Sequence, residues 1–147
     1  MFIDSSAFLA ILGNRSDAAL LVEKIKNSRK PCKTSASVRL DVVMALAESR
    51  ADTRGVSAEA VEQATEIFDS LLQILNVSEI VVSPRIVADG CRLAARFGQQ
   101  ADHPAKLTMQ ACLVLAAAES LHLPVLHSNP AIYRITQEEW TAWRAGE

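Results

Sequence analysis

The chain opens with Met1-Phe2-Ile3-Asp4-Ser5-Ser6-Ala7-Phe8-Leu9-Ala10-Ile11-Leu12. The short apolar run that ends at Asp4 is typical of a strand, and the apolar residues at positions 8, 9, 11 and 12 have helical spacing. Asp4 therefore stands at the carboxyl end of a strand and at the entrance of a helix. Ligands bind along this edge in open α/β sheets, so the stretch predicts both a fold class and a place for chemistry.

The carboxylate of Asp4 has two interpretations. It can cap the amino terminus of the following helix, which stabilises a helix by about 1 kcal/mol. It can also point into a crevice at the sheet edge as a metal ligand. This stretch alone favours the cap, and the rest of the chain is needed to weigh the second interpretation.

The composition is that of an ordinary globular protein. With 147 residues the chain can bury a substantial core, and we expect a single domain over 1–147. Half of the residues (50%) are hydrophobic and 22% are charged. The net charge of -2 excludes bulk electrostatic attraction for nucleic acid, so RNA binding requires a local basic patch.

Cysteine usage and apolar runs indicate the compartment. Cys32, Cys91 and Cys112 have no CxxC spacing, and we expect all three to be small buried residues in a reducing cytoplasm. No apolar run approaches the roughly 20 residues that span a bilayer, and no basic segment precedes an apolar signal-like segment. These patterns predict a cytoplasmic protein without a membrane partner.

Short apolar runs alternate with longer helical patterns along the chain. We expect strands at about 1–4, 32–35, 79–82 and 124–127. We expect helices at about 8–12, 17–27, 37–50, 57–75, 84–97 and 107–121, with a last short helix after the capping-box sequence Thr136-Gln137-Glu138-Glu139. This alternation predicts an α/β fold in which a parallel sheet of about four strands has helices on both faces.

Four segments, in order, resemble one family of proteins. They are Phe2-Ile3-Asp4-Ser5-Ser6-Ala7, then Thr34-Ser35-Ala36-Ser37-Val38-Arg39-Leu40-Asp41, then Leu93-Ala94-Ala95-Arg96-Phe97-Gly98 with His103-Pro104-Ala105-Lys106-Leu107, and last Ala118-Glu119-Ser120-Leu121-His122-Leu123-Pro124-Val125-Leu126. The chain resembles the PIN-domain family, and within it the VapC-type toxins of toxin–antitoxin pairs. The resemblance implies a PIN-like three-layer fold and metal-dependent cleavage of RNA.

The resemblance also implies four acidic positions at one edge of the sheet. Asp4 matches the first, and Asp41 matches the second, which is usually glutamate. The third position holds Ala111 and the fourth holds Ala131, so two of the four acids are missing. Two carboxylates can hold one Mg²⁺ or Mn²⁺ together with water and substrate phosphate, whereas a two-metal arrangement requires replacement ligands.

Four nearby residues are candidates to replace the missing acids. They are Asp102 and His103, before the helix expected at 107–121, and His127 and Asn129, after the last strand. Each also has a plain structural interpretation. Asp102 suits a solvated loop, His103 suits a helix start, and His127 and Asn129 suit a turn.

A basic cluster precedes the second strand. Five cations lie within ten residues, at Lys24, Lys26, Arg29, Lys30 and Lys33. Beside an acidic crevice, such a cluster can hold an RNA backbone. The alternative is a solvated helix end, where cations also complement the helix dipole.

Three hypotheses therefore stand. The first is a VapC-like ribonuclease whose active site is altered and weakened. The second is a catalytically inactive PIN-fold protein that binds RNA or an antitoxin-like protein. The third is an unrelated α/β domain in which Asp4 is only a helix cap. By resemblance, and because the helices near 8–12 and 37–47 are strongly apolar, we also expect a homodimer.

Overall fold

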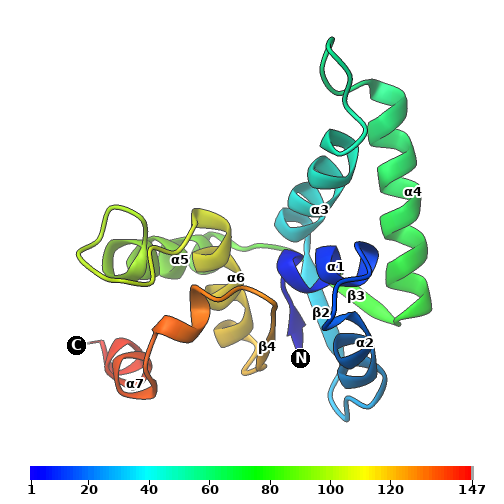
Figure 1. The fold of residues 1–147 in the computed structure, drawn as a ribbon. Coiled ribbons are helices and arrows are strands. Elements are labelled where there is room, and N and C mark those ends of the chain that lie inside the picture. The colour runs from blue at the N-terminus through cyan, green and yellow to red at the C-terminus, as the bar shows by residue number, and fades with distance from the viewer. Residues whose placement is uncertain (147) are drawn as a thin grey trace.

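The computed structural model describes residues 1–146 and contains one parallel sheet (Figure 1). The spatial order of its strands is β3-β2-β1-β4. The strands are β1 (Phe2–Ile3), β2 (Cys32–Ser35), β3 (Val77–Ile80) and β4 (Val125–Leu126). All three pairings are parallel, so the carboxyl ends of the four strands share one edge. The predicted parallel sheet of four strands is confirmed.

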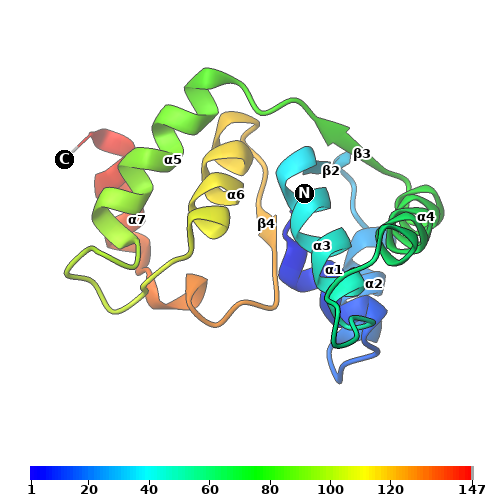
Figure 2. The ribbon, with the colours of Figure 1, turned by 90° about the horizontal axis from the view of Figure 1, so that it is seen from above.

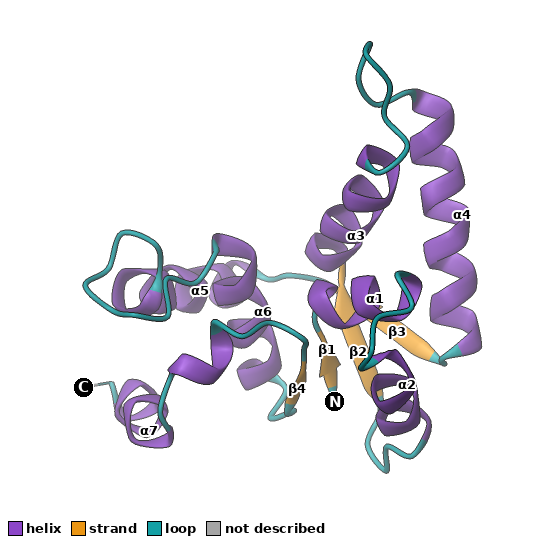
Figure 3. Cartoon of the chain, viewed as in Figure 1, coloured by secondary structure: helices purple, strands orange, loops and turns teal. Residues whose placement is uncertain are grey.

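Helices connect the strands and cover the sheet, which gives the predicted three-layer α/β fold (Figure 3). The helices are α1 (Ser5–Leu12), α2 (Ala18–Lys26), α3 (Ala36–Glu48), α4 (Ala58–Ile74), α5 (Pro84–Phe97), α6 (Met109–Ser120) and α7 (Gln137–Ala145), and a short 3-10 helix, η1, spans Ile132–Arg134. In Figure 2, α5, α6 and α7 gather on the side of β4, and α4 lies beyond α3 on the side of β3.

Side-chain caps fix where most helices begin. Asp4, Ser35, Ser57, Ser83, Thr108 and Thr136 each accept a hydrogen bond from a backbone N–H in the first turn of the helix that follows. Such caps satisfy donors that the helix itself leaves without partners. The capping box at Thr136 and Glu139 forms as the sequence predicts.

The third strand lies two residues earlier than predicted. The β-branched run Ile80-Val81-Val82 indicated a strand at 79–82, whereas β3 ends at Ile80 and Val81 is 87% exposed. The pairing with β2 explains the shift, because Cys32 lies opposite Val77 and Ser35 lies opposite Ile80. Partner contacts across the sheet therefore outweigh local strand propensity here.

The core is centred on β1 and on the buried helix α6. Phe2 and Ile3 are fully buried, and Phe8 packs edge-to-face on Phe68 with ring centroids 5.0 Å apart. Seven of the residues of α6 are buried, as its apolar sequence predicts; they are Ala111, Cys112, Val114, Leu115, Ala116, Ala117 and Ala118. The prediction for cysteines is wrong at Cys91, which lies on an exposed face of α5.

The chain between the helices α5 and α6 is anchored at a glycine. Gly98 ends α5, and a β-carbon there would lie 2.3 Å from the carbonyl oxygen of Ala94. Its backbone pairs with Leu107, whose N–H donates to the carbonyl of Phe97 at 2.8 Å.

In residues 1–146, no helix combines the length and the apolar character needed to cross a bilayer.

Candidate active site

The carboxylate of Asp4 is buried at the carboxyl edge of the sheet and caps α1. Its Oδ2 accepts a hydrogen bond from the backbone N–H of Ser6 at 3.2 Å and from the hydroxyl of Ser6 at 2.5 Å. The residue is only 3% exposed. The cap interpretation is therefore correct, and the remaining question is whether this carboxylate also faces a cavity.

Asp4 does line a cavity, and Asp41 lines the same one. The cavity has a volume of about 230 Å³. Its other lining residues are mostly polar: Ser5, Ser6, Leu9, Arg15, Thr108, Gln110, Ala111 and Asn129. The fold thus brings together β1, α1, α3, α6 and the turn after β4. Two carboxylates that lie far apart in the sequence meet around one space.

Burial raises the pKa of Asp4 above its ordinary value. The hydrogen bonds from Ser6 act in the opposite direction, because they stabilise the charged form. Desolvation is nevertheless the larger effect. A cation in the cavity would compensate the buried charge, so the environment of Asp4 suits a carboxylate with a positively charged partner.

Asp41 reaches the cavity from the exposed side of α3. Its apolar neighbours in the sequence suggested a costly burial, but Val42 and Val43 are buried while Asp41 is exposed. Asp41 is therefore both an exposed residue on a half-buried helix and a residue that lines the cavity. A hydrogen bond at 3.5 Å from the amide of Gln110 to the hydroxyl of Ser37 links α3 to α6 near the cavity.

The two positions where the acids are missing differ. Ala111 is 3% exposed and lines the same cavity as Asp4 and Asp41. Ala131 instead packs on the hydrophobic core. Among the described residues that line the cavity, the one from the turn after β4 is Asn129. Ala131 is thus not among the described residues that line the cavity, whereas Asn129, two residues earlier, is.

Of the four replacement candidates, only Asn129 lines this cavity. Asp102 is an exposed loop residue. His103 accepts a hydrogen bond from the N–H of Ala105 at its Nδ1 atom, and its Nε2 atom lies 3.0 Å from Glu139 Oε1. His127 lines a separate pocket instead. Asp102 is thus a loop residue, as its plain interpretation predicts, whereas His103 lies in the loop before α6 and does not start a helix.

Arg15 is the cavity residue that the sequence did not suggest. It follows α1 in a turn, where its N–H donates to the carbonyl of Ala10 at 3.0 Å. Its side chain lines the cavity from the end of α1 opposite Asp4. A cation on a surface turn has no sequence signature, so only the folded chain reveals this placement.

The turn after β4 is tied to Asp4 by hydrogen bonds. The N–H of Ser128 donates to the hydroxyl oxygen of Ser6 at 2.9 Å, and this hydroxyl in turn donates to Asp4. The hydroxyl of Ser128 donates to Asp17 at the start of α2 at 2.5 Å. These bonds hold three elements at the edge of the cavity, which makes Asp4 part of a pre-organised site.

Three cations of the basic cluster lie away from the acidic cavity. Lys26, Arg29 and Lys30 line a groove of about 810 Å³ with the start of β2 and the start of β3. Asp4 follows the end of β1, so the groove and the acidic cavity lie at opposite edges of the sheet. Lys33 points to β3, where its Nζ donates to Ser78 at 2.7 Å, and Lys24 is exposed on α2. The groove therefore does not adjoin the cavity, and the interpretation of the cluster as an RNA-backbone patch stays a prediction.

The donors in the acidic cavity fit one hard divalent cation. Mg²⁺ is typically held by one or two carboxylates together with water and substrate phosphate. Asp4 and Asp41 supply two carboxylates, and Asn129 and Gln110 add amide oxygens to the lining. Within residues 1–146, no group of three or more His, Cys, Asp or Glu side chains is arranged to hold a metal ion. The donor set therefore fits one ion, not two.

Comparison with known proteins agrees with this architecture. The PIN domain family matches residues 1–138. A VapC ribonuclease from Rhizobium meliloti (strain 1021) is 29% identical over 131 residues, which cover 87% of this chain and 92% of that relative. The family match extends over nearly the whole chain and includes both cavity carboxylates. The chain belongs to the PIN domain family.

Proposed function

We propose that this protein is a VapC-like, metal-dependent ribonuclease with an altered and weakened active site. The observation that carries the proposal is the convergence of Asp4 and Asp41 on one polar cavity at the carboxyl edge of the sheet. The similarity to a VapC ribonuclease supports RNA as the substrate class. Alanine at position 111, within the same cavity, supports the reduced ligand set.

The residues of the cavity have distinct parts in this reaction. Asp4 and Asp41 would hold one Mg²⁺ or Mn²⁺, which when bound supplies charge neutralisation at the phosphate and a water of lowered pKa. Ser6 holds the Asp4 carboxylate in one orientation through two hydrogen bonds. Arg15 lies where its guanidinium can pair with a phosphate oxygen, since planar donors match phosphate well.

The alternative is a catalytically inactive PIN-fold protein that binds RNA or an antitoxin-like partner. One observation favours it: within residues 1–146, no cluster of three metal-binding side chains is present. Under this alternative, Asp4 would cap α1 and tie the β4 turn without any metal. The two proposals differ in one measurable property, which is whether divalent cations change the reactivity toward RNA.

We propose that the basic groove binds the RNA backbone away from the cleaved bond. Lys26, Arg29 and Lys30 line the groove, and Lys24 and Lys33 flank it in the sequence. The groove is separated from the acidic cavity by the length of β2, about 13 Å for four residues. An RNA strand that reaches the cavity therefore has to follow the surface around the sheet to contact these cations.

We also propose a symmetric homodimer. Leu40, Val87 and Met109 are exposed, and Val87 and Met109 line one shallow hollow. Burying such side chains in a self-complementary interface removes apolar area from water. Light scattering at micromolar concentration should give twice the mass of one chain, and the Met109→Asp variant should shift the mass toward that of a monomer. A monomeric parent would contradict this proposal.

The ribonuclease proposal is tested by RNA cleavage with Mg²⁺ and with Mn²⁺. The parent should cleave slowly, and cleavage should stop when the metal is chelated. Asp4→Asn is a sharper variant than Asp4→Ala, because asparagine also caps helices and keeps the fold intact while removing the charge. Asp4→Asn and Asp41→Asn should both reduce cleavage to the level seen without metal.

Asp102→Asn is the matched control, since Asp102 is an exposed carboxylate outside the cavity. It should cleave RNA as fast as the parent. Cleavage that is unaffected by Asp41→Asn, or that persists without divalent metal, would reject the proposed site. A complete lack of cleavage by the parent in either metal would instead favour the inactive PIN-fold protein.

A further inference from the structure

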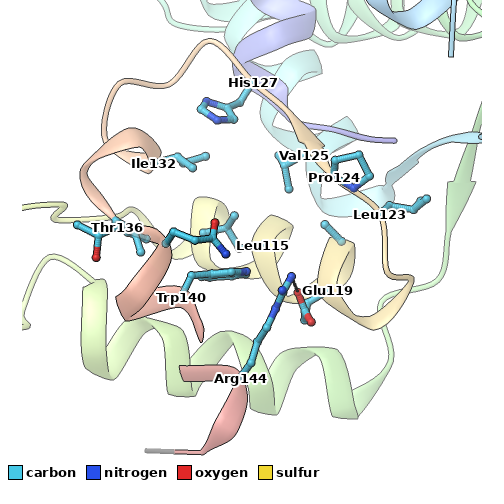
Figure 4. A pocket seen from close by; sticks show the side chains of 13 residues that line it. Leu115, Glu119, Leu123, Pro124, Val125, His127, Ile132, Thr136, Trp140 and Arg144 are labelled. Atoms are coloured by element: carbon cyan, nitrogen blue, oxygen red, sulfur yellow. Dashed lines mark hydrogen bonds and ion pairs between the residues drawn. The ribbon is translucent and has the colours of Figure 1, made fainter. Parts of the chain in front are cut away.

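A second pocket lies on the far side of the turn that follows β4 (Figure 4). It is formed by α6, β4, η1 and α7, and its volume is about 250 Å³. That volume is just below the roughly 300 Å³ at which pockets for drug-sized ligands begin, so the pocket suits one planar ring system. Its walls are largely aliphatic and include Leu115, Leu123, Val125, Ile132 and Ile135.

One end of the pocket combines an aromatic surface with a polar edge. Trp140 lies beside the Glu119–Arg144 ion pair in Figure 4, and the two charged groups are 2.7 Å apart. The Arg144 guanidinium carbon is 5.6 Å from the centroid of the Trp140 ring. Trp140 is held in place by Trp143, which stacks on it with centroids 5.1 Å apart. The aromatic surface is therefore fixed before any ligand binds.

The ion pair retains unused hydrogen-bonding capacity. Arg144 Nη2 donates to Glu119 Oε2, and within residues 1–146 neither side chain makes another hydrogen bond. A carboxylate has about four acceptor sites and a guanidinium has five donors. The pocket thus offers an acceptor and a donor side by side, next to an aromatic ring.

We propose that this pocket binds a guanine base of single-stranded RNA. The Watson–Crick edge of guanine carries the O6 acceptor beside two N–H donors, at N1 and N2. Arg144 would donate to O6, Glu119 would accept from N1–H and N2–H, and the base would stack on Trp140. Proteins read unpaired RNA bases in this way, by stacking and by hydrogen bonds to the base edges.

The position of the pocket connects it to the acidic cavity. His127 lines the pocket and Asn129 lines the cavity, and two residues span at most about 7 Å of chain. The turn between them is fixed to Asp4 through Ser128 and Ser6. This inference rests on the proposed ribonuclease function and deepens it, because a base in this pocket would belong to a nucleotide close to the cleaved bond.

A second aromatic surface lies near the His127 end of the pocket. Tyr133 is 75% exposed, and its ring is 4.5 Å from that of His127 by centroids. In Figure 4, His127 stands at the opposite end of the pocket from Trp140. An adjacent base can stack on Tyr133 without entering the pocket, which supports a single-stranded ligand that continues past it.

The test is equilibrium binding of short dye-labelled RNA strands, measured by fluorescence anisotropy without divalent metal so that no cleavage occurs. Each strand consists of uridines with one central guanosine, adenosine, cytidine or uridine. The guanosine strand should bind the parent about tenfold more tightly than the other three, the usual size of discrimination by good base contacts. Glu119→Gln and Trp140→Leu should each remove this preference.

Glu138→Gln is the matched control, because Glu138 is an exposed carboxylate of α7 that does not line the pocket. It should keep the preference for guanosine. Circular dichroism of every variant confirms folding, and Glu119→Gln preserves the size of the side chain if Trp140→Leu does not fold. Equal affinities for the four strands, or an unchanged preference in Glu119→Gln, would overturn the proposal.

These measurements separate the pocket from the ribonuclease proposal. Metal-dependent cleavage together with base-independent binding would reject the guanine pocket and leave the active site standing. A guanosine preference that depends on Glu119, in a protein that never cleaves RNA, would support the pocket and reject the proposed activity.

Discussion

The two edges of the sheet carry opposite charges and are built in different ways. At the carboxyl edge, Asp4 is buried, hydrogen-bonded to Ser6 and linked through Ser128 to the β4 turn. At the amino edge, Lys26 and Arg29 are exposed cations on the rim of a broad groove. One edge is an organised cavity and the other is an open surface.

This difference determines how each edge should respond to substitution. A group that the fold holds in place affects stability and function together, because its neighbours lose a partner when it is removed. Exposed charges can be exchanged with little effect on folding. The acidic edge should therefore be sensitive in both respects, and the basic edge only in binding.

The largest expected effect comes from rebuilding the acidic edge with Ala111→Asp and Asn129→Asp together. Four carboxylates around one cavity repel one another at reduced dielectric, so the double variant should melt below the parent without metal. Added Mn²⁺ should raise its melting temperature more than that of the parent. At 100 times the dissociation constant, such binding adds about 2.7 kcal/mol to the stability of the fold.

Ala131→Asp with Asn129→Asp is the control pair, since Ala131 packs on the core and does not line the cavity. Thermal melts with and without Mn²⁺ should show a smaller metal-induced shift for this pair than for the pair that includes Ala111. Equal shifts for the two pairs would show that the cavity is not the metal site.

A smaller effect on stability distinguishes the helix-capping role of Asp4 from the role of its negative charge. Asp4→Ala removes the cap of α1 and leaves Ser6 without its acceptor, so it should destabilise the fold by about 1 kcal/mol or more. Asp4→Asn should retain most of the stability. Urea denaturation of the two variants measures the difference, and identical stabilities would show that the cap contributes nothing.

At the basic edge, replacing Lys26, Arg29 and Lys30 with Gln should leave stability within about 0.5 kcal/mol of the parent. The affinity for single-stranded RNA should fall, and its dependence on salt should weaken by about 2 in the log–log slope, because three phosphate contacts are lost. Titrations at several salt concentrations measure this slope. A slope equal to that of the parent would remove the groove from the RNA-binding surface.

The smallest effect concerns acid and lies outside both edges. Hydrogen bonds from Thr136 and from His103 lower the pKa of Glu139 to about 2. A lowered carboxyl pKa contributes stability above the unfolded pKa, and this stability is lost as pH falls toward the folded value. The melting temperature of the parent should therefore fall more between about pH 5 and about pH 3 than that of Glu139→Gln.

The acid response distinguishes the two carboxylates, because the pKa of buried Asp4 shifts in the opposite direction. Its effect on stability consequently has the opposite sign, present at low pH and lost as the pH rises through the raised pKa. If the melting temperature of Glu139→Gln falls as much in acid as that of the parent, the acid sensitivity comes from elsewhere in the chain.

Local sequence signals predicted most of the fold. Helices begin where Ser57, Ser83 and Thr136 predict, because a cap depends on residues only two or three positions away. The third strand was misplaced because its position depends on pairing with β2, far away in the sequence. The exposed position of Cys91 likewise depends on which face of α5 the rest of the chain covers.

The site was predicted in part. The strand-end position of Asp4 and the resemblance at Asp41 and Ala111 identified three residues of the cavity, and Asn129 was a replacement candidate. Arg15 was missed because a turn cation carries no signal until α1 places it. The pocket around Trp140 was missed because its residues come from separate elements that meet only in the folded chain.

Calorimetric titration of Mn²⁺ into the parent, Asp41→Asn and Asp102→Asn tests directly whether Asp4 and Asp41 form one metal site. We expect the parent and Asp102→Asn each to bind about one ion per chain, the number that two carboxylates can hold. Asp41→Asn should show no binding at the same concentrations. Binding by Asp41→Asn with the affinity of the parent would contradict a metal site shared by Asp4 and Asp41.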